Sequence, residues 1–243
     1  QKYNFELNLI GKIQIKNILM VILAAYKSGL EINKILNVMN KIKPVEGRLE
    51  KIGDVRNKSK VILDYAHTPE ALELALSNLK EQFPESRINL VFGCGGDRDQ
   101  KKRSFMGRIA ERYSDKIFLT DDNPRYENPN KIRRDIKRGI KKAIIEEIPN
   151  RKYAINKAIQ DLKTGDLLLI AGKGHEKTQD YGNKKLFFSD RKVILDSIKI
   201  KNRYLSNNIK LNIVKEQSTT SISKNLTFKN ISINSKTIKK NDI

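Results

Sequence analysis

The sequence contains one cysteine, two histidines and no apolar run of the length that a membrane-spanning helix needs. Because Cys94 is alone, no disulfide framework can form, and the composition fits a reducing compartment. No signal peptide is visible, so we expect a cytoplasmic protein without a membrane partner. A histidine-based metal site would need both His67 and His175 together with carboxylates, and one cysteine argues against a structural zinc. The sequence therefore predicts no metal-ligating residues.

Acidic residues are also few: 28 Asp and Glu stand against 49 Lys and Arg, which gives a formal net charge of +21. Such a surplus is typical of nucleic-acid-binding surfaces, because Lys and Arg neutralise phosphates. Here the basic residues are spread along the chain, aromatic residues make up only 7%, and no nucleic-acid-binding module is recognisable. We expect no nucleic-acid partner and keep a basic nucleic-acid-binding domain as an alternative.

The chain has 243 residues, of which 38% are hydrophobic, and this is enough for a globular core. It opens at Gln1 in the middle of a pattern and ends at Ile243 just after a strand-like stretch, so we expect a fragment. Helices are predicted over residues 11–29 and 32–42, followed by a break at 44–48 that we interpret as a hinge between domains. The apolar face of the first helix would consist of Ile15, Ile18, Leu19, Ile22, Leu23 and Tyr26.

From residue 60 onward, short apolar runs alternate with segments of helical period. The predicted strands cover residues 49–55, 60–63, 88–92, 116–119, 167–170 and, as an edge strand, 186–188. The predicted helices cover residues 69–82, 102–113, 154–163 and 190–200, and a further helix begins at Asn128 and Pro129. Strands alternating with helices predict an α/β fold, with a Rossmann-like, mostly parallel sheet and helices on both faces.

Polar loops follow the carboxyl ends of four of these strands. In open α/β sheets, ligands bind in the crevice outside the carboxyl ends of the strands, so we expect these loops to face one site. The residues that would converge there are Asp64, His67, Arg98, Asp122, Arg125, Lys173 and Glu176.

The loop after the strand at 116–119 carries charges of both signs. Asp122 can accept a hydrogen bond from an ammonium group, Arg125 can bind a carboxylate through two N–H groups, and Pro124 stiffens the backbone between them. This pair suits a zwitterionic amino acid. The glycine-rich stretches at 93–99 and 172–175 can let backbone amides approach an anion, or can simply be turns.

Five short motifs together resemble the ATP-dependent Mur ligases of peptidoglycan synthesis, and among them the MurE-type enzymes that add meso-diaminopimelate. The motifs are Gly-Arg at 47–48, Asp-Tyr-Ala-His-Thr-Pro at 64–69, Gly-Cys-Gly-Gly-Asp-Arg-Asp at 93–99, Asp-Asn-Pro-Arg at 122–125 and Gly-Lys-Gly-His-Glu at 172–176. The resemblance covers about residues 8–200. In that family, Asp-Asn-Pro-Arg marks diaminopimelate as the added amino acid, whereas lysine-adding relatives differ there.

The resemblance implies roles for individual residues. Those that would hold meso-diaminopimelate are Arg98, Asp122, Asn123, Arg125, Gly172 and Glu176. Those on the nucleotide side would be Asn17, Arg48, Asp64 and His67. We expect His67 and Lys173 to take part in catalysis, with ATP and Mg2+ as cofactors. The implied reaction joins meso-diaminopimelate to the D-glutamate side-chain carboxylate of UDP-N-acetylmuramoyl-L-alanyl-D-glutamate.

The resemblance also implies a domain division. Residues 1–46 would end the central ATP-binding domain and 47–200 would form the Mur ligase C-terminal domain. The family's phosphate loop, magnesium-binding carboxylate and carbamylated lysine belong to parts largely absent here, so we expect this chain alone to be inactive. Residues 201–226 would be a linker, and 227–243 resemble the start of a second, MurF-type ligase, which implies a fusion.

Two further alternatives stay open at this point. One is a Mur-like ligase for another amino acid. The other is a non-catalytic amino-acid-binding module derived from the ligase fold.

Overall fold

The structure is a computed structural model that describes residues 5, 7 and 9–219. The chain divides into two units, Gln1–Ile198 and Lys199–Ile243. All predicted site residues lie in the first unit. No helix within the described ranges combines the length and the apolar character that crossing a bilayer requires.

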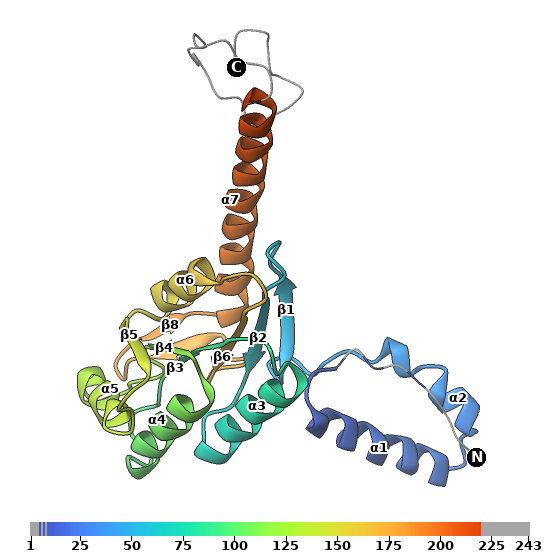
Figure 1. Cartoon of the computed structure of the whole chain (residues 1–243). Helices are drawn as coiled ribbons and strands as arrows, with labels where there is room; N and C mark the ends of the chain where they lie inside the picture. The colour runs from blue at the N-terminus through green and yellow to red at the C-terminus, as the bar shows by residue number, and fades with distance from the viewer. Residues whose placement is uncertain (1–4, 6, 8, 220–243) are drawn as a thin grey trace. The chain divides into compact units, whose positions relative to one another are not determined.

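A six-stranded sheet forms the centre of the first unit, in the order β1-β2-β6-β3-β4-β5 (Figure 1). Its strands are β1 (Glu50–Asp54), β2 (Lys60–Asp64), β3 (Ile88–Phe92), β4 (Lys116–Leu119), β5 (Ile144–Glu147) and β6 (Leu167–Ala171). Every neighbouring pair is parallel except β1 and β2, which are antiparallel. The predicted mostly parallel α/β sheet is therefore confirmed.

Helices alternate with these strands. They are α3 (Pro69–Gln82), α4 (Lys101–Tyr113), α5 (Pro129–Lys137), α6 (Arg151–Asp161) and α7 (Asp190–Thr219). The predicted start of α3 is correct, since the Thr68 hydroxyl accepts a hydrogen bond from the Ala71 N–H and a proline follows at the first helical position. Asn128 and Asn150 cap α5 and α6 in the same way.

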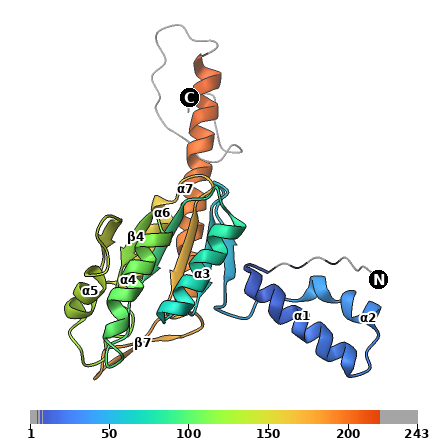
Figure 2. The same cartoon turned by 60° about the horizontal axis from the view of Figure 1, so that its bottom comes forward.

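The helices cover both faces of the sheet. Leu167, Leu169 and Ala171 of β6 share one core with the buried residues of α3, α4 and α5. Figure 2 shows α3 and α4 side by side over this face. Leu168 and Ile170 alternate with them and point to the opposite face, where α6 packs on β3, β4 and β6. Two-sided burial explains why the central strands are continuous apolar runs.

The N-terminal segment forms α1 (Lys12–Lys27), α2 (Ile32–Leu36) and a 3-10 helix (Met39–Lys41). The second predicted helix is therefore shorter than expected. Of the predicted apolar face of α1, only Ile18 is buried, in a small cluster with Ile35 and Met39. The face is otherwise open, with exposed fractions of 46% for Ile15, 51% for Leu19 and 58% for Leu23.

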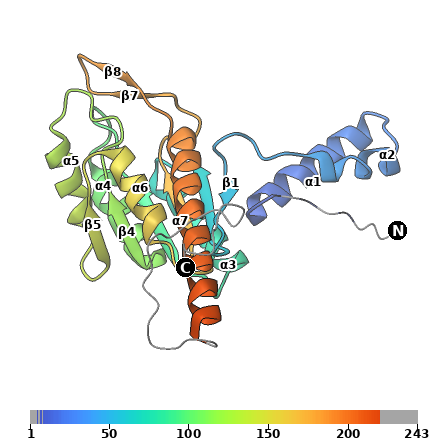
Figure 3. The same cartoon turned by 90° about the horizontal axis from the view of Figure 1, so that it is seen from above.

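Three features differ from the sequence-based expectation. Strand β5 was not predicted, because Ile-Ile-Glu-Glu is short, half charged and at the sheet margin. The expected edge strand at 186–188 was misplaced: β8 (Lys185–Phe187) pairs only with β7 (Thr178–Asp180), in a separate hairpin (Figure 3). Residues 201–219 of the expected linker are helical, as the continuation of α7. The predicted ligase start at 227–243 lies outside the described residues.

Candidate substrate-binding site

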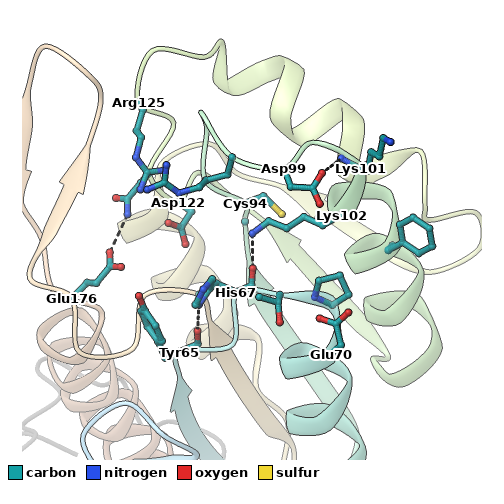
Figure 4. Close-up of a pocket in the computed structure, with 18 residues that line it drawn as sticks. Tyr65, His67, Glu70, Cys94, Asp99, Lys101, Lys102, Asp122, Arg125 and Glu176 are labelled. Atoms are coloured by element: carbon teal, nitrogen blue, oxygen red, sulfur yellow. Dashed lines mark hydrogen bonds between the residues drawn. The ribbon is translucent and has the colours of Figure 1, made fainter.

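A cavity of about 760 Å³ opens at the carboxyl ends of the parallel strands (Figure 4). Loops after β2, β3, β4 and β6 line it, together with the first turns of α3 and α4. The lining residues are Tyr65, His67, Thr68, Pro69, Glu70, Gly93, Cys94, Gly95, Arg98, Asp99, Lys101, Lys102, Phe105, Asp122, Asn123, Arg125, Gly172 and Glu176. The structure thus brings the six residues predicted for diaminopimelate, and His67, to one place.

The hairpin β7–β8 fixes the loop at 120–125 from the side. Gln179 donates from its amide to the backbone oxygen of Asp122 over 2.7 Å. The Arg125 N–H donates to Asp180 O at 3.0 Å, and the Asp180 N–H donates to Asn123 Oδ1 at 3.0 Å. These bonds tie backbone and side chain of the loop to a separate element, so its shape does not depend on a bound ligand.

Glycines after β3 make room for this same loop. A Cβ atom on Gly96 would lie 1.8 Å from Pro124 O, and one on Gly95 would lie 2.9 Å from Arg125 Nη1. Arg125 has a left-handed backbone, with φ of 51°, and its Nη1 donates to Gly96 O at 2.7 Å. From the sequence this stretch could be either an anion-binding backbone or a turn. At these two positions the glycines are needed for contact between two loops of the protein itself.

The loop after β6 presents Glu176 to the cavity. Its carboxylate accepts hydrogen bonds from Lys173 Nζ at 2.9 Å and from Asn123 Nδ2 at 3.0 Å. Burial opposes ionisation, but these two bonds hold the pKa of Glu176 below its ordinary value. Glu176 is therefore an ionised acceptor at neutral pH.

Lys173 lies in the cavity wall. It is fully buried, and its ammonium group also donates to Asn123 Oδ1 at 2.8 Å. Lys173 is absent from the residues that line the cavity. Its predicted catalytic role stays a prediction.

Asp122 is the second acid of the site and, unlike Glu176, it is buried. Burial raises its pKa, and the positive charges of Arg151 and Lys173 oppose that shift. A Cβ on Gly172, whose φ is +114°, would lie 2.5 Å from Asp122 Oδ2. The carboxylate therefore packs directly against the glycine backbone.

The residues predicted for the nucleotide side are less concentrated. Asp64 accepts the N–H groups of Leu49 and Ala66 at 2.7 and 2.8 Å, and burial raises its pKa. The Arg48 guanidinium stacks on the ring of Tyr65 at 4.7 Å.

His67 and Asn17 complete that predicted set. His67 lies in the cavity lining, and its Nδ1 lies 2.9 Å from Tyr65 O. Asn17 is exposed on α1, where its amide donates to Gln14 at 3.5 Å. Only His67 of the four lines the cavity, and all four roles stay predictions. Within the described ranges no three His, Cys, Asp or Glu side chains form a group that could hold a metal ion.

Several residues in and around the cavity were not predicted from the sequence. Lys102 donates to His67 O at 2.8 Å and could have been found, because it follows the glycine-rich loop at a predicted helix start. Cys94 is buried beside Met106, and burial raises the pKa of its thiol to about 12. Arg151, which contacts Asp122 from behind, carried no signal, since an arginine opening a helix is usually exposed.

An open α/β domain with a polar cavity at the carboxyl ends of its strands belongs to the class of folds that bind ligands at this edge of the sheet. Residues 47–174 match the model of the family described as Mur ligase, glutamate ligase domain. The chain therefore belongs to the Mur ligase family, as its motifs indicated.

Similar proteins agree with this assignment. The chain is 48% identical over 192 residues to the UDP-N-acetylmuramoyl-L-alanyl-D-glutamate--2,6-diaminopimelate ligase of Rickettsia felis, covering 79% of this chain and 36% of the relative. The ligase of the same name from Buchnera aphidicola is 46% identical over 195 residues, with 80% and 38% covered. This chain thus spans less than half the length of these relatives.

Solved structures show the same fold. A structure of a UDP-N-acetylmuramoyl-L-alanyl-D-glutamate--2,6-diaminopimelate ligase superposes with a TM-score of 0.65 at 33% identity, covering 82% of this chain and 41% of the other. UDP-N-acetylmuramate-alanine ligase from Thermotoga maritima has a TM-score of 0.56 at 19% identity, covering 84% and 40%. The second likeness extends to the fold alone.

Proposed function

We propose that this chain is the amino-acid-binding part of an ATP-dependent ligase that adds meso-diaminopimelate to UDP-N-acetylmuramoyl-L-alanyl-D-glutamate. One observation carries the proposal: two carboxylates, the buried Asp122 and the partly buried Glu176, and two arginines, from three separate loops, line a single cavity. Similarity to ligases named for 2,6-diaminopimelate supports the choice of ligand.

Diaminopimelate has an ammonium and a carboxylate group at each end. We assign the carboxylates to Arg125 and Arg98, because a guanidinium can donate two parallel hydrogen bonds. Asp122 and Glu176 would receive an ammonium group. The fixed loops hold these groups in place before the ligand arrives, which reduces the entropy lost on binding.

In the proposed reaction, the amine of the bound amino acid forms an amide with the D-glutamate side-chain carboxylate, and ATP supplies the driving force. The contribution of this chain would be to hold the amino acid in a fixed orientation toward the activated carboxylate. His67 lines the cavity beside Tyr65 and Lys102, and its part in nucleotide binding and catalysis stays a proposal.

ATP and Mg2+ are the cofactors we propose for the whole enzyme. We propose no magnesium ligand within this chain. We propose a cytoplasmic location, since the reaction consumes ATP and a UDP-linked substrate. The fusion to a second ligase stays a proposal that rests on the sequence of 227–243 alone.

Isothermal titration calorimetry with meso-diaminopimelate and L-lysine tests the ligand. Meso-diaminopimelate should bind measurably and more tightly than L-lysine, which lacks one carboxylate. Arg125→Ala should remove most of that preference, because the variant loses its hydrogen bonds to a carboxylate that meso-diaminopimelate has and L-lysine lacks. Equal affinities for both ligands would contradict the proposal and favour a Mur-like ligase for another amino acid.

A further inference from the structure

Arg151, the first residue of α6, is 1% exposed and does not line the cavity. Its Nε and Nη2 donate to the two carboxylate oxygens of Asp190 at 2.8 and 2.7 Å. Nη2 also donates to Ala171 O at 2.9 Å. Arg151 thus joins the starts of α6 and α7 to the end of the central strand β6.

The third nitrogen of this guanidinium, Nη1, takes no part in the hydrogen bonds to Asp190 and Ala171. Nη1 is buried and has no hydrogen-bond partner within the part of the chain that the structure describes. It lies 4.0 Å from Oδ2 of Asp122. No other cation of the described residues lies within 4 Å of that carboxylate, and no described donor forms a hydrogen bond to it. Two buried charges of opposite sign therefore face each other across the cavity wall.

Asp122 is surrounded by charged or ionisable groups from four elements. They are Arg151 on α6, Lys173 and Glu176 after β6, Asp190 on α7 and Cys94 after β3. Burial and the negative charges of Glu176 and Asp190 raise the pKa of Asp122. Arg151 is the strongest of the groups that oppose this shift. The protonation of Asp122 thus depends on a residue behind the cavity.

We propose that Arg151 is a positioning residue that keeps Asp122 ionised and fixed toward the cavity, so that this carboxylate can receive the ammonium group of the ligand. The inference rests on the proposed function for the identity of the ligand, but not for the effect on Asp122. The pair Arg151 and Asp190 is rigid because both partners are buried and bidentate. The remaining nitrogen of Arg151, Nη1, has no hydrogen-bond partner among the described residues and lies 4.0 Å from Asp122, so the cation stabilises the ionised form of this acid.

The test compares charge-changing variants of the 243-residue chain by NMR titration of the Asp122 carboxyl carbon. In Arg151→Gln the titration midpoint should move to higher pH, and in Asp190→Asn it should move to lower pH. A purely structural disturbance would not separate the two variants by sign. Arg151→Lys should restore most of the wild-type midpoint, since it keeps the charge. An unchanged or lower midpoint in Arg151→Gln would overturn the inference.

Ligand binding provides the second readout. At about pH 6, meso-diaminopimelate should bind Arg151→Gln roughly tenfold more weakly than wild type, and the deficit should shrink as pH rises. Arg133→Gln is the matched control: Arg133 is equally buried and pairs with the neighbouring Asp121, so its loss should leave the Asp122 midpoint in place.

If Arg151→Gln does not fold, a double variant in which both partners are neutral takes its place. Arg151→Gln combined with Asp190→Asn removes both charges of the Arg151–Asp190 pair, so neither partner is left charged without the other, and the Asp122 midpoint should still rise, because Arg151 has the larger influence. If wild type binds no meso-diaminopimelate at any pH, the proposed function fails, while the midpoints still decide the role of Arg151.

Discussion

Gly172 lies so close to Asp122 that a Cβ atom at residue 172 would be 2.5 Å from Asp122 Oδ2. The backbone of one loop therefore forms the surface against which the acid of another loop packs. The φ of +114° at Gly172 adds a second requirement for glycine.

Gly172→Ala should displace the Asp122 carboxylate and weaken meso-diaminopimelate binding by roughly tenfold to a hundredfold, the equivalent of one charge-assisted hydrogen bond. Calorimetry measures this loss. Gly165→Ala is the control, because Gly165 also has a positive φ, of +81°, but a Cβ there meets nothing within 4 Å. The control should lose about 1 kcal/mol of stability and no affinity. Equal affinity losses in both variants would contradict the close packing.

Gln179→Ala should weaken ligand binding although Gln179 does not line the cavity. Its amide is buried and donates to the backbone oxygens of Asp121 and Asp122, at 3.3 and 2.7 Å. Leaving these acceptors unpaired should cost about 1–3 kcal/mol in the free energy of unfolding. Denaturant titration and calorimetry measure the two effects. Lys185→Ala, on the exposed strand β8 of the same hairpin, should change neither.

Arg103→Met should destabilise the domain by about 3–5 kcal/mol, because the buried Asp135 and the partly buried Glu127 lose a fully buried partner. Arg103 is fully buried and bonds to Glu127 at 2.8 Å and to Asp135 at 3.1 Å. Arg138→Met removes another arginine from Asp135, one that is 69% exposed, and should cost less than about 1 kcal/mol. Urea denaturation of both variants gives the comparison. Similar losses in the free energy of unfolding for the two variants would show that burial does not determine how much these ion pairs stabilise the domain.

The stability difference between wild type and Arg103→Met should depend on pH. The hydrogen bond from Arg103 lowers the pKa of Glu127 below its ordinary value of 4.5. A lowered folded-state pKa gives stability that is present above the unfolded-state pKa and is lost as pH falls through the folded-state value. The difference should therefore be constant near neutral pH and shrink below about pH 4.5. A difference that grows on acidification would contradict this assignment.

Cys94 should resist alkylation in the folded protein. Burial raises the pKa of its thiol to about 12, so at pH 8 only ~10⁻⁴ of the molecules carry the reactive thiolate. Because the sequence has one cysteine, labelling with iodoacetamide reports this site alone. Unfolding in guanidinium should speed labelling by orders of magnitude. Rapid labelling of native protein would show that the cavity opens to the thiol.

The order of strands and helices from residue 60 onward could be predicted because local signals agree with the fold. Thr68 with Pro69 and Asn128 with Pro129 mark helix starts that need no tertiary context. Strand β5 could not be found in this way. Its sequence, Ile-Ile-Glu-Glu, does not alternate between apolar and polar residues, and its pairing with β4 is what makes it a strand.

The site was predictable where residues follow strand ends, as Asp122 and Glu176 do. The sequence did not reveal the supporting residues, because Arg151 and Gln179 reach the site from other elements through buried contacts. Lys173 shows the opposite limit. Its motif placed it correctly in the loop, but only packing could show that its ammonium group turns into the wall.

Gly47, which lies between the N-terminal helices and the sheet, is in close contact with the loop after β6. A Cβ on Gly47, whose φ is +68°, would lie 2.6 Å from the nitrogen of His175, and one on Gly174 would lie 3.1 Å from Gly47 O. The backbone at residue 47 thus packs directly against the backbone at residues 174–175, with no side chain between them. Residue 47 is therefore fixed to the loop after β6, and because the N–H groups of Gly11 and Lys12 donate to side chains of α3, the N-terminal helices are held to the sheet domain at both ends.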